Sequence, residues 1–172
     1  MKKIYFAALL AMVGITSLSA CGESGGLDQP LPADDPTSEV TVEFWHCLGQ
    51  AKGNELQKIV DAFNIDPRFA GKYKVVAKAM GGGYDDLDYN IVTQVSAGQV
   101  PAISMGYPDS FSMYLSKKES RSYLLRIDSW IKDANFGYTQ EELNDFIPGY
   151  YAEGNKYQFE GTFSMPMYKS FE

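Results

Sequence analysis

Hydrophobic and polar residues alternate near the start of the chain in a way that predicts a strand. The segment VTVEFWHCLGQ, residues 40–50, places two valines and a phenylalanine at every second position, as in a half-buried strand. The alternation breaks at Trp45, His46 and Cys47, where the strand is expected to stop. An indole, the chain's only histidine and a thiol therefore mark a candidate site at a strand end.

The next segments alternate between helical and strand patterns. Apolar residues recur at helical spacing from Leu56 to Phe63, with Asn54 as the expected N-cap of that helix. A second strand is predicted over residues 73–80, and three glycines lead into a second helix that ends before Gly98. A third strand is predicted over residues 100–106. This order is typical of an α/β fold with a parallel sheet covered by helices.

The later part of the chain shows shorter patterns. Short helices are predicted near residues 111–115 and after Asp128, which is the expected cap of the second one. A capping box at Thr139 opens a further helix, which Pro148 is expected to end. The aromatic segment 150–167 is read as extended, with a turn at Gly154-Asn155.

The N-terminus has the features of a secretory signal. Two lysines precede an apolar run, residues 4–13, which is shorter than the ~20 residues needed to span a bilayer. Leu18-Ser19-Ala20-Cys21 then resembles the bacterial lipobox, which implies cleavage after residue 20 and a lipid on Cys21. The alternative is a plain signal peptide with an incidental cysteine. Residues 21–38, rich in Gly, Pro, Asp and Ser, are predicted to form a flexible tether.

Charge narrows the possible partners. The chain of 172 residues carries a formal charge of −7, and loss of Lys2 and Lys3 with the signal would leave 13 basic and 22 acidic residues, or −9. Such a chain is a poor candidate for binding nucleic acid. We expect an extracytoplasmic protein attached to the bacterial cell membrane through acyl chains, with Cys47 as an unpaired, buried thiol.

Several short motifs together resemble the family 1 extracellular solute-binding proteins of ABC importers. The glycerol-3-phosphate-binding branch is the most similar, with maltose and oligosaccharide binders as neighbours. The motifs that carry the resemblance are Phe44-Trp45-His46, Gly83-Tyr84, residues 97–102, Phe146-Ile147-Pro148, Tyr157 and residues 165–170. The resemblance implies two lobes with the ligand between them. Residues 39–172 would form the first, a periplasmic-binding-protein-like (type II) lobe that is incomplete at its C-terminus.

The resemblance also implies ligand-binding residues. Tyr84 and Ser170 match ligand-contacting residues of the glycerol-3-phosphate branch. That branch has an acidic residue where this chain has Pro108, and Asp109 is the candidate substitute one residue later. Trp45 and His46 would lie at the cleft edge, because ligands of open parallel sheets bind beyond the carboxyl ends of the strands. The alternative is that Trp45 fills the core and His46 bonds a neighbouring loop.

The expected function is a lipid-anchored solute-binding component of an ABC importer that captures a sugar or polyol phosphate for its permease subunits. The sequence has no G-x-S-x-G or H-E-x-x-H motif and no paired cysteines, so we expect no enzyme and no cofactor. We expect no metal site, because residues 85–90 lack the glycine and glutamate of a calcium loop. The alternatives are a non-transport receptor or adhesive surface lipoprotein on the same fold and, less favoured, a surface glycoside hydrolase.

Overall fold

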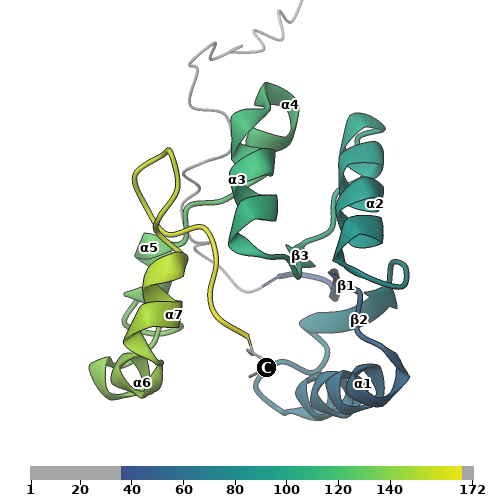
Figure 1. The fold of residues 1–172 in the computed structure, drawn as a ribbon. Coiled ribbons are helices and arrows are strands. Elements are labelled where there is room, and N and C mark those ends of the chain that lie inside the picture. Colours follow the sequence, from purple (N-terminus) through teal and green to yellow (C-terminus); the bar gives the residue numbers. More distant parts are fainter. Residues whose placement is uncertain (1–35, 168–172) are drawn as a thin grey trace, which may run out of the picture.

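A computed structural model describes residues 36–167, apart from the side chain of Glu119. Strands and helices alternate in its first part, and short helices follow (Figure 1). In chain order the elements are β1 (Val40–His46), α1 (Gln50–Ile65), β2 (Tyr73–Ala79), α2 (Tyr84–Ser96), β3 (Ile103–Ser104), α3 (Pro108–Ser116), α4 (Lys118–Arg121), α5 (Asp128–Ile131), α6 (Gln140–Asp145) and α7 (Pro148–Glu153). No helix between residues 36 and 167 is long and apolar enough to cross a membrane.

The three strands form a parallel sheet in the order β2-β1-β3. β1 pairs with β2 along its whole length, from Val40 opposite Tyr73 to His46 opposite Ala79. The predicted α/β class with a parallel sheet is therefore confirmed. Figure 1 shows α1 on one side of the sheet and α2 and α3 on the other. The two crossovers, from β1 to β2 and from β2 back across β1 to β3, run in opposite directions along the sheet. Because both are right-handed, the helices α1 and α2 that they contain lie on opposite faces.

The main core lies between the sheet and helices α2 and α3. Leu87 and Leu115 have no exposed surface. Seven residues from the sheet, the strand ends and these two helices form one buried cluster: Trp45, Cys47, Leu87, Ile91, Val95, Met105 and Tyr114. Burial of such side chains contributes roughly 1.5–3 kcal/mol each, so this face is the main source of stability.

Helix α1 covers the opposite face and also closes an edge of the sheet. The side-chain amide of Asn64 donates to the carbonyl of Val75 at 2.9 Å, and its oxygen accepts the N–H of Val75 at 2.8 Å. In a parallel strand the N–H and C=O of one residue point to the same side, so these bonds occupy the outer edge of β2. The prediction of Asn54 as N-cap is wrong. Gly49 is the N-cap and the helix starts at Gln50, directly after the β1 loop.

The third strand is shorter than predicted. β3 contains only Ile103 and Ser104, which pair with Phe44 and Trp45 of β1. Pro101 has no N–H to donate to a ladder, so pairing starts only after it. Helix α2 fits its prediction closely, because it begins after the three glycines and ends at Ser96, two residues before Gly98 with its φ of 75°.

The later region differs more from expectation. The capping box is confirmed, since the Thr139 hydroxyl accepts the Glu142 N–H and the Glu142 carboxylate accepts the Thr139 N–H. Pro148 does not end that helix; α6 stops at Asp145 and Pro148 is the first residue of α7. Proline favours this position because its fixed φ suits a first helical turn. As a result residues 150–153 are helical instead of extended, and residues 154–167 contain no strand.

Candidate functional site

Backbone hydrogen bonds join the carboxyl ends of the three strands. The His46 carbonyl accepts the Met80 N–H at 2.8 Å, and the Trp45 carbonyl accepts the Met105 N–H at 3.0 Å. The loops that follow the strands, residues 47–49, 80–83 and 105–107, therefore start at one edge of the sheet. We call these three loops and the first turns of α2 and α3 the carboxyl edge.

The strand order identifies the part of this edge that suits a ligand. The connection from β1 runs to β2 on one side, whereas β3 lies on the other side of β1. The loops after β1 and β3 therefore diverge, and in open parallel sheets ligands bind in the crevice at such a switch point. The candidate functional site is accordingly placed at the carboxyl edge by the topology, independently of any sequence motif.

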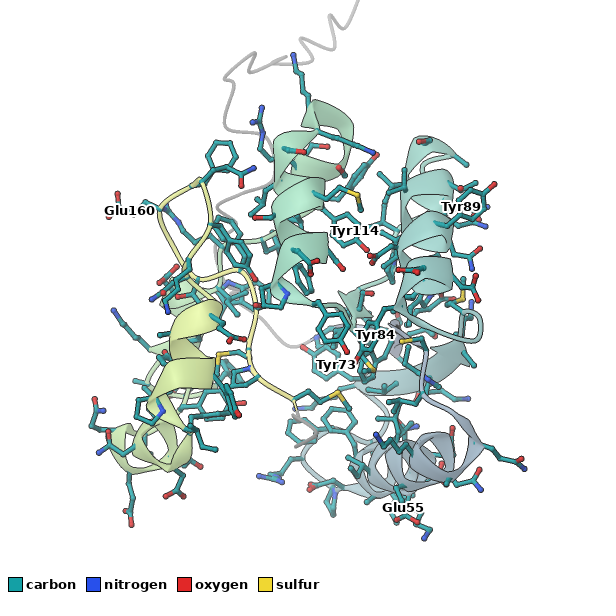
Figure 2. All side chains as sticks on the ribbon, in the orientation of Figure 1. Glu55, Tyr73, Tyr84, Tyr89, Tyr114 and Glu160 are labelled. Atoms are coloured by element: carbon teal, nitrogen blue, oxygen red, sulfur yellow. The ribbon has the colours of Figure 1, made fainter. Side chains whose placement is uncertain are left out.

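Tyr84 lies at this edge as the first residue of α2, as the labelled side chain in Figure 2 shows. Residues 82–86 line an open hollow of about 490 Å³ beside it. Its ring contacts that of Tyr107, with centroids 4.0 Å apart and planes inclined by 35°. The turn before it needs glycine: Gly81 has φ 125°, and a Cβ there would lie 2.5 Å from the Cβ of Asp86.

Carboxylates surround the first turns of the two helices at this edge. Asp85 and Asp86 are exposed in the first turn of α2, and Asp109 is exposed in the first turn of α3. Asp86 accepts the Gly82 N–H at 3.0 Å. These carboxylates offset the positive ends of the helix dipoles, which would otherwise attract an anion. The edge is therefore rich in acceptors for hydroxyl groups and unfavourable for a phosphate.

Trp45 is buried, with 5% of its surface exposed. Its indole N–H donates to Glu43 at 3.0 Å, and Lys78 of β2 pairs with the same carboxylate. The bonds from Lys78 and then Trp45 lower the pKa of Glu43 below its ordinary value. The position of Trp45 corresponds to the alternative in which it fills the core, although it stands at the predicted strand end.

His46 is also buried, with 6% of its surface exposed. Its Nδ1 accepts the Leu48 N–H at 3.2 Å, which places the ring proton on Nε2 in the neutral form. Burial lowers the pKa of the imidazole and favours that form. Among residues 36–167 no buried side-chain nitrogen or oxygen lacks a partner. His46 therefore corresponds to the alternative in which it bonds a neighbouring loop.

Of the other predicted site residues, Asp109 lies in a helix, and two lie outside the described residues. Asp109 does not lie on a free loop, because it belongs to the first turn of α3, where its carboxylate accepts the Ser110 N–H at 3.2 Å. Ser170 and the proposed lipidation site Cys21 lie outside the described residues. The structure therefore brings Tyr84 and the end of β1 to one edge and places Asp109 at the adjacent helix start.

A buried polar cluster beneath this edge was not anticipated from the sequence. Asp88 of α2 accepts hydrogen bonds from the Ser110 hydroxyl at 2.7 Å and from the Tyr114 hydroxyl, both on α3. Figure 2 shows Tyr114 reaching from α3 toward α2. Burial, and secondly the bond to Asp88, raise the pKa of the Tyr114 phenol, so it remains a donor. The available signal was an aspartate on the same helical face as Ile91 and Val95.

Comparison with known proteins adds no family to these observations. No protein-family model matches the chain, and no curated protein matches it. Within residues 36–167 there is no group of three or more His, Cys, Asp or Glu side chains that could hold a metal ion.

Proposed function

We propose that the protein is the lipid-anchored, extracytoplasmic solute-binding component of an ABC importer, and that residues 39–172 belong to its first, type II periplasmic-binding-protein-like lobe. The observation that carries the proposal is the switch point between β1 and β3, where the loops after these two strands diverge at the carboxyl edge of a parallel sheet. Two of the sequence motifs that resemble the solute-binding family, residues 44–46 and Gly83-Tyr84, border the same edge. The lipobox-like segment before Cys21 supplies the expected attachment to the membrane.

The proposed ligand is a sugar or a polyol phosphate, with Tyr84, Asp109 and Ser170 as contacts from this lobe. The exposed carboxylates of Asp85, Asp86 and Asp109 support the uncharged member of that pair, because they repel a phosphate and accept hydrogen bonds from hydroxyl groups. A hydroxylated ligand donates hydrogen bonds as well as accepting them, so these acceptors suit it.

Fatty-acid labelling tests the proposed attachment to the membrane. Cells grown with a labelled fatty acid should attach label to the wild-type protein, because the small residues before Cys21 fit a lipobox. The Cys21→Ala variant should carry none. Label that persists in the variant contradicts the anchor. Genes for two permease subunits beside this gene would support transport, and their absence would favour the receptor or adhesive alternative.

The binding part is tested by calorimetric titration of the full-length protein, which includes both proposed lobes and is called the full chain below, with maltose and with glycerol-3-phosphate. Tyr84→Phe and Ser170→Ala should each weaken binding of the preferred ligand, because a lost hydrogen bond to a buried ligand group costs on the order of 1–3 kcal/mol, roughly tenfold to a hundredfold. Tyr123→Phe is the matched control. α3 begins at the carboxyl edge and leads away from it, and Tyr123 comes after α4, which follows the far end of α3. Unchanged binding by both folded variants would contradict the assigned contacts. Binding of neither compound would contradict the proposed ligand class.

A further inference from the structure

Tyr107 is an exposed aromatic residue at the carboxyl edge that the sequence motifs do not mark. It lies between β3 and α3, and 48% of its surface is exposed. Its ring contacts the ring of Tyr84, which is half-buried against the main core. The Tyr84 ring thus lies against one face of the Tyr107 ring, while about half of the surface of Tyr107 stays exposed.

The backbone around Tyr107 is also fixed. Tyr107 is the N-cap of α3, with φ −85° and ψ 161°, and Pro108 is the first helical residue. Proline restrains the residue before it to extended conformations, so Tyr107 has little freedom at this position. Gly106 brings the chain close to Phe111, whose ring would lie 2.9 Å from a Cβ at that glycine. A ring held in this way loses little conformational entropy when a ligand contacts it.

The groups around the ring pair match the two kinds of surface that a sugar presents. A pyranose has one face of C–H groups, which packs on an aromatic ring, and a rim of hydroxyls, which need polar partners. Tyr107 supplies the exposed ring, the ring of Tyr84 lies behind it, and Asp85 and Asp109 lie in the first turns of α2 and α3. A small polyol phosphate has no such face, and its charge is opposed by the carboxylates.

We infer that Tyr107 is a specificity-determining contact residue, and that its outer ring face, backed by the ring of Tyr84, forms an aromatic platform for the apolar face of an uncharged sugar ring. This inference rests on the proposed function and adds a residue to its site. The platform selects ring sugars over linear polyols and their phosphates.

Saturation-transfer NMR on the full chain in phosphocholine micelles, with maltose as the probe, tests the platform. Irradiation of the tyrosine ring protons should transfer most strongly to H3 and H5 of a glucose ring, because these protons share one face. Tyr107→Ala should weaken maltose binding about threefold to tenfold, and Tyr107→Phe should keep it within about twofold, because stacking needs the ring and not the hydroxyl. Tyr123→Ala is the matched control, because Tyr123 is also 48% exposed.

Three results would overturn the platform, and they separate it from the wider proposal. Unchanged maltose affinity in Tyr107→Ala would remove Tyr107 from the site and leave the proposed function intact. An equal loss of glycerol-3-phosphate affinity in Tyr107→Ala would show a general effect on the edge instead of ring stacking. Failure of the wild-type chain to bind maltose at all would overturn both the platform and the sugar ligand on which it rests.

Discussion

The two halves of the described chain are held together by different interactions. Residues 40–116 contain the sheet, the two longest helices and the whole main core cluster. Residues 118–167 contain four helices of only four to six residues each. In Figure 1 α5, α6 and α7 form a group beside the sheet unit. We refer to these halves as the sheet unit and the helical unit.

Polar bonds and ring contacts between specific residues connect the short helices and loops of the helical unit. Asp128 accepts both the N–H and the hydroxyl of Thr162, at 2.7 and 2.9 Å. Tyr138, Phe146 and Tyr151 follow one another with ring centroids 5.7 and 5.8 Å apart. Helices this short are not stable alone, so their positions depend on these specific contacts. The sheet unit depends instead on burial of apolar area, which tolerates the loss of any one polar bond.

The largest effect is expected from the core of the sheet unit. Leu87→Ala should lower the free energy of unfolding by about 2–5 kcal/mol, because Leu87 has no exposed surface and its truncation leaves a cavity. Urea titration followed by circular dichroism measures the change. Ile59→Ala is the control, since Ile59 of α1 is 66% exposed and should lose less than about 0.5 kcal/mol. Equal losses in the two variants would contradict the assigned core.

A smaller and more local effect is expected in the helical unit. Asp128→Ala removes both acceptors of Thr162, whose buried groups then lack partners, at a cost on the order of 1–3 kcal/mol. Amide hydrogen exchange should accelerate at Ile127 and Thr162 and stay unchanged in β1. The exposed neighbour variant Ser129→Ala should leave both regions unchanged. Faster exchange throughout β1 would show that the two units open together.

Acid should weaken the sheet unit through its single histidine. Burial lowers the pKa of His46, so the unfolded chain takes up a proton first as the pH falls below about 6.5. Stability is therefore full above that pH and falls on acidification, by at most about 1.4 kcal/mol per pH unit for one proton. Protonation of Nδ1 would also break its bond from the Leu48 N–H. Urea midpoints between pH 7.5 and 5.5 should shift in the wild type and stay nearly constant in His46→Gln; equal shifts in both would contradict this assignment.

The smallest effect is expected at the cap of α6. Thr139→Ala should cost about 1 kcal/mol of local stability, because the first turn loses the hydroxyl that accepts its N–H. Thr139→Ser keeps the acceptor and should remain close to the wild type. Hydrogen exchange at residues 140–145 is the measurement. An alanine variant that exchanges no faster than the serine variant would show that packing against α7, not the cap, holds this helix.

The contrast between the units explains which predictions succeeded. Periodicity located β1, β2 and α2 well, because apolar residues repeat several times along each element. In α2 the repeated residues Leu87, Ile91 and Val95 are buried. A helix of four to six residues spans little more than one turn, so α7 shows no period, and its aromatic residues resembled a strand pattern. Two helix starts there were identified from cap residues and not from a repeat: the capping box at Thr139 is confirmed, and Asp128 is the first residue of α5, whose N-cap is Ile127.

Part of the candidate site could also be predicted from the sequence. A strand end followed by Trp45 and His46, and a helix start at Tyr84, were visible in the sequence. Tyr107 was not, because its importance comes from β3 lying beside β1 and from contact with the ring of Tyr84, 23 positions earlier in the chain. Contacts across the fold of this kind have no local signal. The burial of Trp45 likewise depends on α2 packing over it.

Amide hydrogen exchange of the full chain with and without saturating maltose tests most directly the claim that the carboxyl edge is the ligand site. The proposed site predicts slower exchange at residues 81–85 and 106–107 and at Leu48, with no change in the second surface hollow, which includes Asn155, Tyr157 and Gly161. Protection confined to that second hollow, or spread evenly over the helical unit, would contradict a ligand site at the strand ends.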